Sequence, residues 1–145
     1  MKKAALAFLL LCCIIFSACQ KGSSHASSFS LEIIDPQTTG TVGESITFTA
    51  ELNNNAEQEY HLSHGIPLIL LYIYPAEATP EEPLLSTSIS TVIQPGETIS
   101  KSIHIELLEE GNYLLKASCR FEAGGESIEL EAGPISIAVS AHKPS

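Results

Sequence analysis

The strongest constraint on the fold of this chain is a strict alternation of apolar and polar residues, repeated along most of its length. It is cleanest over residues 46–52, where two opposed sets alternate: Ile46, Phe48, Ala50 and Leu52 against Thr47, Thr49 and Glu51. Successive side chains of a β-strand point to opposite faces, so this pattern predicts a strand with one buried face. Several such segments separated by short turn signals are typical of an antiparallel sandwich.

We therefore expect seven or eight strands in one domain spanning residues 29–141, followed by a tail at 142–145. Gly124-Gly125 indicates a two-residue hairpin, and Gly133-Pro134 is expected to kink or split the last strand. The predicted strands are 29–33, 46–52, 68–74, 84–93, 99–107, 113–122, 127–131 and 135–139.

The short motif Glu110-Gly111-Asn112-Tyr113 resembles the tyrosine corner of immunoglobulin-like sandwiches. The resemblance implies that the Tyr113 hydroxyl donates a hydrogen bond to nearby backbone. Trp is absent and Cys119 has no second cysteine to pair with in the domain, so an antibody-type domain is excluded. The predicted fold class is all-β, a single immunoglobulin-like antiparallel β-sandwich.

The N-terminus has the order of a secretory signal, with Lys2 and Lys3 before an apolar run over 4–16. That run is too short to span a bilayer, which takes about 20 apolar residues. Phe16-Ser17-Ala18-Cys19 resembles the bacterial lipobox, with Phe16 in place of the more usual Leu. The resemblance implies removal of residues 1–18 and lipidation of the Cys19 sulfur. We thus predict a bacterial lipoprotein on the extracytoplasmic face of the cell membrane, with residues 19–28 as a flexible tether.

The predicted signal also determines which cysteines remain free in the mature protein. Cys12 and Cys13 would be removed with it, and Cys19 would carry the lipid. Cys119 would then be an unpaired thiol, which we expect to be buried as a small hydrophobe.

The charge balance restricts the partners of the domain. The chain carries a net charge of −10, and loss of Lys2 and Lys3 leaves 5 basic against 17 acidic residues, or −12. Such a surface repels nucleic acid and anionic headgroups, so we expect no nucleic-acid partner and attachment by acyl chains alone.

Residues 75–83 form a proline-rich acidic segment, the candidate partner-binding loop. Prolines at 75, 80 and 83 favour an extended backbone, which lowers the entropic cost of binding. The alternatives are a Ca²⁺ site on its carboxylates and a solvated connector. The candidate contact residues are Glu77, Pro80, Glu81 and Glu82.

His61 and His64 are the histidines spaced closely enough to share a metal ion. Neutral imidazole suits Zn or Cu, with a third ligand from Glu57, Glu59 or His104. Residues three apart on an extended segment point to opposite faces, so chelation would need a turn, and we expect a solvated loop and no metal.

Catalytic constellations are absent from the sequence. Asp35 is the single Asp, no Ser or Cys lies in a nucleophile motif, and no Gly-rich phosphate loop precedes a helix. We predict that the protein is not an enzyme and uses no cofactor.

A second resemblance concerns the order of turn motifs, which is similar to that of the intracellular proteinase inhibitor (BsuPI) domain of bacilli. The residues concerned are Asn53-Asn54, His64-Gly65, Pro95-Gly96-Glu97 and Gly111-Asn112-Tyr113. This resemblance implies binding of a partner through exposed loops. The predicted function is a non-enzymatic protein-binding or scaffolding module at the cell envelope, with a proteinase inhibitor and a metal-handling lipoprotein as alternatives.

Overall fold

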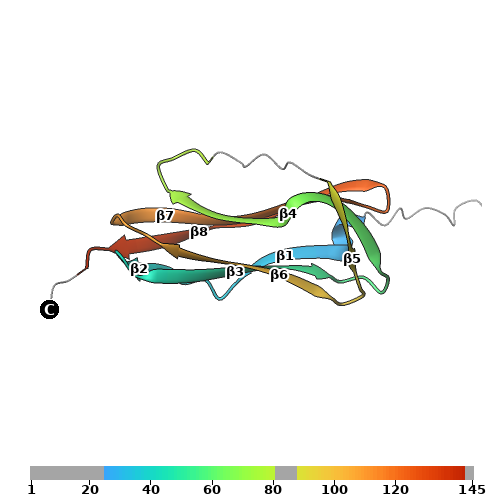
Figure 1. Cartoon of the computed structure of the whole chain (residues 1–145), viewed down its shortest axis with the longest axis horizontal. Helices are drawn as coiled ribbons and strands as arrows, with labels where there is room; N and C mark the ends of the chain where they lie inside the picture. Colours follow the sequence, from blue (N-terminus) through green and yellow to red (C-terminus); the bar gives the residue numbers. More distant parts are fainter. Residues whose placement is uncertain (1–24, 81–87, 143–145) are drawn as a thin grey trace, which may run out of the picture.

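The chain folds into two stacked β-sheets, as seen in a computed structural model that describes residues 25–80 and 88–142 (Figure 1). One sheet has three strands in the order β1-β3-β6, and the other has five in the order β2-β8-β7-β4-β5. A single 3₁₀ turn, η1 (His25–Ser28), precedes them, and within the described ranges no helix is long and apolar enough to cross a membrane. The strands are β1 (Phe29–Ile34), β2 (Thr39–Thr41), β3 (Ser45–Asn54), β4 (Tyr60–Pro75), β5 (Ile89–Ile93), β6 (Thr98–Glu106), β7 (Gly111–Ala123) and β8 (Glu126–Ser140).

The predicted immunoglobulin-like sandwich is confirmed, with one exception to its antiparallel pairing. β2, for which no strand was predicted, runs parallel to β8, with Thr39 opposite Ala138. The chain leaves the first sheet after β1, and β2 joins the second sheet. Glycine at position 40 allows β2 to pass close to β3, because a Cβ there would lie 2.5 Å from the Ile46 side chain.

The apolar side chains of the alternating pattern point inward and form the core between the two sheets. Phe48, Ala50 and Leu52 of β3 are fully buried, as the sequence predicts, and Leu115 and Ile137 meet them from the second sheet. Removal of this apolar surface from water is the main force holding the two layers together.

β4 begins at Tyr60, well before the predicted residue 68, and contains Pro67. The register with β7 shifts between His64 and Ile69, so that residues 65–68 lie opposite the single residue Arg120. A bulge of this kind leaves residues out of the ladder, and Pro67 lacks the N–H that a ladder position requires. The bulge interrupts the alternation of side chains along β4, so the sequence pattern did not predict a strand over residues 60–67.

β8 is one continuous strand and not a split one. Gly133 has a φ of +91°, and a Cβ there would lie 2.6 Å from the Leu115 carbonyl oxygen. The register with β7 shifts between Leu115 and Ala117, so the irregularity is absorbed as a local bulge. β5 covers only residues 89–93 of the strand predicted over 84–93, of which residues 84–87 lie outside the described residues.

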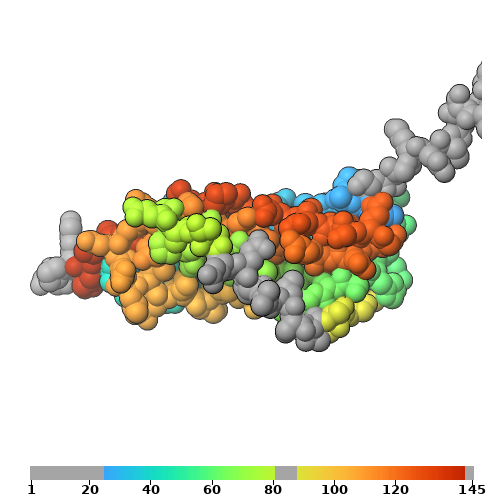
Figure 2. All heavy atoms as spheres, turned by 90° about the horizontal axis from the view of Figure 1, so that it is seen from above, coloured from blue at the N-terminus to red at the C-terminus, as the bar shows by residue number. Residues whose placement is uncertain are grey.

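Most strands run along the length of the body, so the turns gather at its two ends (Figure 1). The space-filling view shows that this body is elongated (Figure 2). We call one the η1 end, made of η1, the turns at 55–59 and 94–97, and the hairpin at 124–125. The other, the far end, holds the turns at 42–44 and 107–110, the segment 76–80 after β4, and the end of β8.

Candidate functional site

The predicted partner-binding loop begins at the far end of the sandwich. Glu77 is exposed and Pro80 is half-buried, while Glu81 and Glu82 lie outside the described residues, as does the predicted lipidation site Cys19.

The start of this loop is held against the first residues of β7. Pro75 pairs with Tyr113 in the β4–β7 ladder, and the Ala76 N–H donates to the Asn112 carbonyl oxygen at 2.9 Å. The Ala78 N–H then donates to the Pro75 carbonyl oxygen, also at 2.9 Å, which closes a turn. These bonds fix Glu77 beside the turn that connects β6 and β7.

The predicted tyrosine corner is confirmed at that same turn. The Tyr113 hydroxyl donates to the Glu109 carbonyl oxygen at 3.1 Å. This bond ties the turn at residues 107–110 to the first residues of β7, so its carboxylates project from a fixed backbone.

A pocket of about 340 Å³ lies between the loop and this turn. Its rim carries three carboxylates, those of Glu77, Glu109 and Glu110. The next residue towards β6, Leu108, has 72% of its surface exposed. We call Glu77, Leu108, Glu109 and Glu110 the far-end surface.

Residues 108–110 lie between the strands predicted at 99–107 and 113–122 and were not predicted as part of a site, although they complete this surface. The sequence does hint at an exposed apolar residue here. Leu108 directly follows Leu107, the last inward-facing residue of the alternation, and therefore lies outside the core.

The described basic residues lie elsewhere on the molecule. On β7, Lys116 forms an ion pair with Glu131 and Arg120 forms one with Glu129, each at 2.6 Å. Lys101 lies on β6. The far-end surface is therefore negative, with no basic residue among the lining residues of its pocket.

The two candidate metal-binding histidines do not converge. They lie on β4 and not in a loop, with His61 exposed and His64 buried on the opposite face of the strand. The His64 ring bonds to the Gly65 carbonyl oxygen through Nδ1 and lies 2.8 Å from the Thr91 hydroxyl through Nε2. His61 lies 3.9 Å from Glu59. Within residues 25–80 and 88–142, no three His, Cys, Asp or Glu side chains are grouped to hold a metal.

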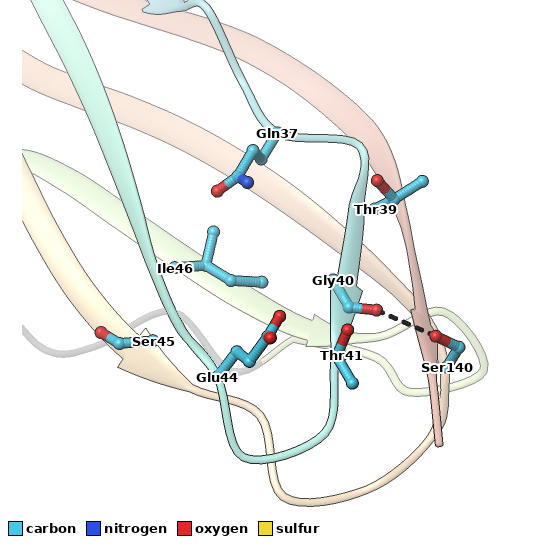
Figure 3. A pocket seen from close by; sticks show the side chains of 8 residues that line it. All are labelled: Gln37, Thr39, Gly40, Thr41, Glu44, Ser45, Ile46 and Ser140. Carbon is cyan, nitrogen blue, oxygen red and sulfur yellow. Dashed lines mark hydrogen bonds between the residues drawn. The ribbon is translucent and has the colours of Figure 1, made fainter. Parts of the chain in front are cut away.

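A second pocket at the far end, of about 310 Å³, lies between β2 and β3 (Figure 3). Four of its eight lining residues carry hydroxyl groups, and Glu44 supplies one carboxylate. The Ser140 hydroxyl donates across the edge of the pocket to the Gly40 carbonyl oxygen at 3.4 Å. It contains no nucleophile with an adjacent base.

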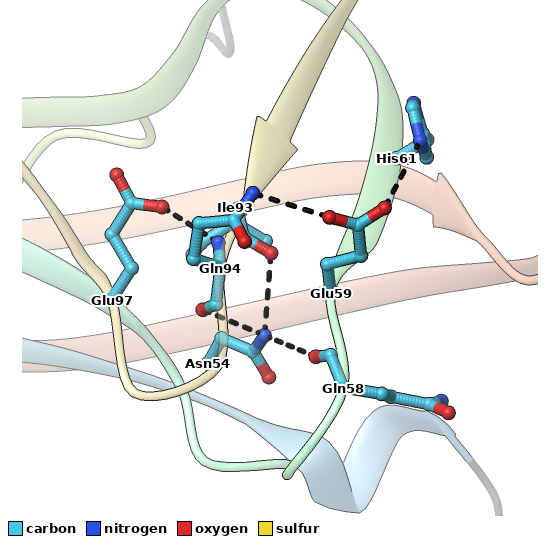
Figure 4. Close-up of polar contacts among 7 residues, drawn as sticks. All are labelled: Asn54, Gln58, Glu59, His61, Ile93, Gln94 and Glu97. Atoms are coloured by element: carbon cyan, nitrogen blue, oxygen red, sulfur yellow. Dashed lines mark hydrogen bonds and ion pairs between the residues drawn. The ribbon is translucent and has the colours of Figure 1, made fainter.

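The η1 end is stabilised by a buried amide (Figure 4). Asn54, with 1% of its surface exposed, donates through Nδ2 to three carbonyl oxygens, those of Gln58 at 2.9 Å, Ile93 at 3.4 Å and Gln94 at 3.0 Å. Its Oδ1 accepts from the Ala56 N–H at 3.1 Å. This network joins the β3–β4 turn to the β5–β6 turn, so it stabilises the fold.

Cys119 is buried, as predicted for an unpaired thiol. Burial raises the pKa of its thiol to about 12, and a backbone hydrogen bond from Leu130 opposes that rise only in part. A thiol with so high a pKa is a poor nucleophile, because the thiolate is the reactive form.

Comparisons with known proteins give structural similarity without a sequence family. No protein-family model matches the chain, and no curated protein matches it in sequence. The kinship with the BsuPI inhibitor domain therefore stays a prediction.

Three solved structures have a similar arrangement. The CARDB domain of PF1109 from Pyrococcus furiosus has a TM-score of 0.47 at 13% identity, over 77% of this chain and 94% of that one. The PapD-like domain 7 of human CEP192 has a TM-score of 0.44 at 14% identity, over 87% and 93%. The sporulation control protein Spo0M from Bacillus subtilis has a TM-score of 0.46 at 18% identity, over 79% and 50%.

Proposed function

We propose that this protein is a non-enzymatic binding or scaffolding module of the cell envelope, anchored by a lipid on Cys19. The lipobox-like sequence before Cys19 supports the anchor. The far-end surface supports the binding role, because it gathers three carboxylates and an exposed leucine on two adjoining segments. The tyrosine corner holds the turn at residues 107–110, and the backbone bonds of Ala76 and Ala78 hold the segment that carries Glu77.

The partner is a protein whose contact surface carries Lys or Arg around an apolar position. Carboxylates at the rim steer and select a basic surface, while an apolar centre supplies the desolvated contact. Glu77, Glu109 and Glu110 are exposed, so their attraction is screened by salt and the complex weakens as ionic strength rises.

A photo-crosslinking amino acid at Leu108 in living cells tests the proposed contact. We expect one protein to be captured from Leu108 and not from Glu57, an exposed residue at the η1 end. Equal capture from both positions would contradict a contact at the far end.

Charge variants then test the chemistry of that contact with the captured protein. Replacing Glu77, Glu109 and Glu110 by Gln removes about 0.5 kcal/mol per exposed pair, so the affinity falls about tenfold. The matched control makes the same change at Glu32, Glu57 and Glu122, which are exposed at other places. An equal loss in both triple variants would mean that only net charge matters.

A further inference from the structure

The last four residues of the predicted tether are packed against the sandwich. They form η1, which precedes β1 at the η1 end (Figure 1). A tether that serves only as a spacer needs no such contacts.

His25 is held at both its backbone and its ring. Its N–H donates to Glu126 Oε2 at 3.0 Å, and its Nδ1 lies 3.0 Å from the Tyr60 hydroxyl. The two rings also pack edge to face, with centroids 5.4 Å apart. Tyr60 is 5% exposed and packs on Phe29, so the contact links η1 to the core.

Gly124 leaves the space that the His25 ring occupies. A Cβ at Gly124 would lie 2.9 Å from His25 Nε2, and the residue has a φ of +59° that favours glycine. The Tyr60 hydroxyl also accepts from Gln58 at 2.7 Å and lies 3.4 Å from Ser28. The turn is thus bound by β4 and by the β7–β8 hairpin together.

This docking shortens the chain between the proposed anchor and the folded body. Residues 20–24 can span at most about 18 Å, whereas residues 20–28 would span up to about 32 Å if η1 were released. The sandwich itself is roughly 40 Å long, from the 13 residues of β7 at about 3.4 Å each.

We propose that docked η1 is an orienting strut, which holds the η1 end towards the membrane and presents the far-end surface away from it. The inference rests on the anchoring at Cys19 proposed above. It follows from the attachment point at one tip of an elongated body and from the short span that remains.

Energy transfer to a membrane acceptor tests this orientation in the acylated mature protein, residues 19–145, bound to vesicles of phosphatidylcholine and phosphatidylglycerol. A donor dye is placed on Glu57→Cys at the η1 end or on Glu110→Cys at the far end, and the acceptor is a labelled lipid. Acylated Cys19 and buried Cys119 do not compete for the dye. We expect strong transfer from the η1 end and weak transfer from the far end.

Releasing the strut should remove that difference. The variant His25→Ala with Glu126→Ala loses the ring contact and the backbone contact while leaving the core intact. The matched control, His61→Ala with Glu122→Ala, removes the same two residue types from exposed positions on the sheet. We expect the two transfer signals to converge in the first variant and to stay apart in the control.

Three other outcomes would contradict the anchor, the orientation or the role of η1. Equal transfer from both ends in the vesicle-bound wild type overturns the orientation, and a difference that survives release of η1 overturns the role of the strut. Protein that never associates with vesicles contradicts the anchor and the orientation together. Amide hydrogen exchange of residues 26–28 in solution then measures the docking of η1 separately, with protection expected in the control and lost in His25→Ala with Glu126→Ala.

Discussion

Replacement of Asn54 should lower the stability of the η1 end substantially. Its amide has four hydrogen-bond partners in a buried position, and three of them are carbonyl oxygens that can only accept. A polar group buried without a partner costs about 1–3 kcal/mol, so both the donor and the acceptor side of this amide matter.

We expect Asn54→Ala to lower the free energy of unfolding by about 2–3 kcal/mol. Asn54→Asp should cost more at pH 7, about 3–5 kcal/mol, because a carboxylate would face three carbonyl oxygens. Burial raises the pKa of the new carboxyl above its unfolded value of about 3.9, so its stability loss should grow as pH rises above 4. Urea unfolding at pH 4 and pH 7 measures this, and a pH-independent loss would contradict it.

Cys119 should behave as a hydrophobe and not as a reactive thiol. With a pKa of about 12, only about one thiol in 10,000 is ionised at pH 8. We expect the folded Cys19→Ala mature domain to resist a disulfide reagent, and to react once unfolded in urea. Rapid labelling of the folded domain would show that this thiol is accessible.

The same thiol should make stability fall in alkali. Its folded pKa is raised from 9.0 to about 12, so the unfolded state releases its proton first as pH rises above 9. Between those values the free energy of unfolding should fall more steeply for the wild type than for Cys119→Ala.

Among the elements, β6 is an edge strand of the three-stranded sheet, and a lysine on it opposes pairing with another chain. Lys101 lies opposite Ala50, a fully buried residue, so it stands on the core-facing side of the strand, yet it is exposed. A charge on the inward side of an edge strand blocks pairing with another chain, since a second strand would bury it.

Lys101→Val should therefore fold normally but self-associate through β6. Valine completes an apolar row with Ile99 and Ile103, which leaves an unprotected edge. Sedimentation at increasing concentration should show dimers or larger species for Lys101→Val and a single species for Lys101→Arg. A monomeric Lys101→Val would mean that other features protect this edge.

The elements that the sequence predicted are those with uninterrupted periodicity. β3, β6 and β7 follow the period of two and were predicted within a few residues, and the Gly111-Asn112-Tyr113 motif predicted the tyrosine corner. β4 was shortened because its bulge at 65–68 resets the alternation. β2 was missed because three residues are too few for a period, and its pairing with β8 depends on a contact about a hundred residues away.

The candidate site shows the same limit. The prolines and glutamates of segment 75–83 mark it in the sequence as a candidate loop. Its neighbours Leu108, Glu109 and Glu110 could not be predicted, because the β4–β7 ladder brings them beside it. Likewise, the sequence of residues 20–28 reads as a polar spacer, because the contacts of His25 with Tyr60 and Glu126 cross large distances in sequence.

For the whole molecule, the two ends of the sandwich have different roles in the proposed function. The η1 end holds the docked turn and the Asn54 network, and the far end holds the acidic surface fixed by Tyr113. A rigid elongated body with attachment at one tip and a binding surface at the other is suited to bridging a membrane and a partner.

The most direct test of this account is lipid incorporation at Cys19 in cells. Radiolabelled palmitate should enter the wild-type protein and Cys119→Ala equally, and both should sediment with membranes. Cys19→Ala should take up no label and leave the membrane fraction. Absence of label from the wild type, with Cys19→Ala in the same fraction as the wild type, would contradict the central claim.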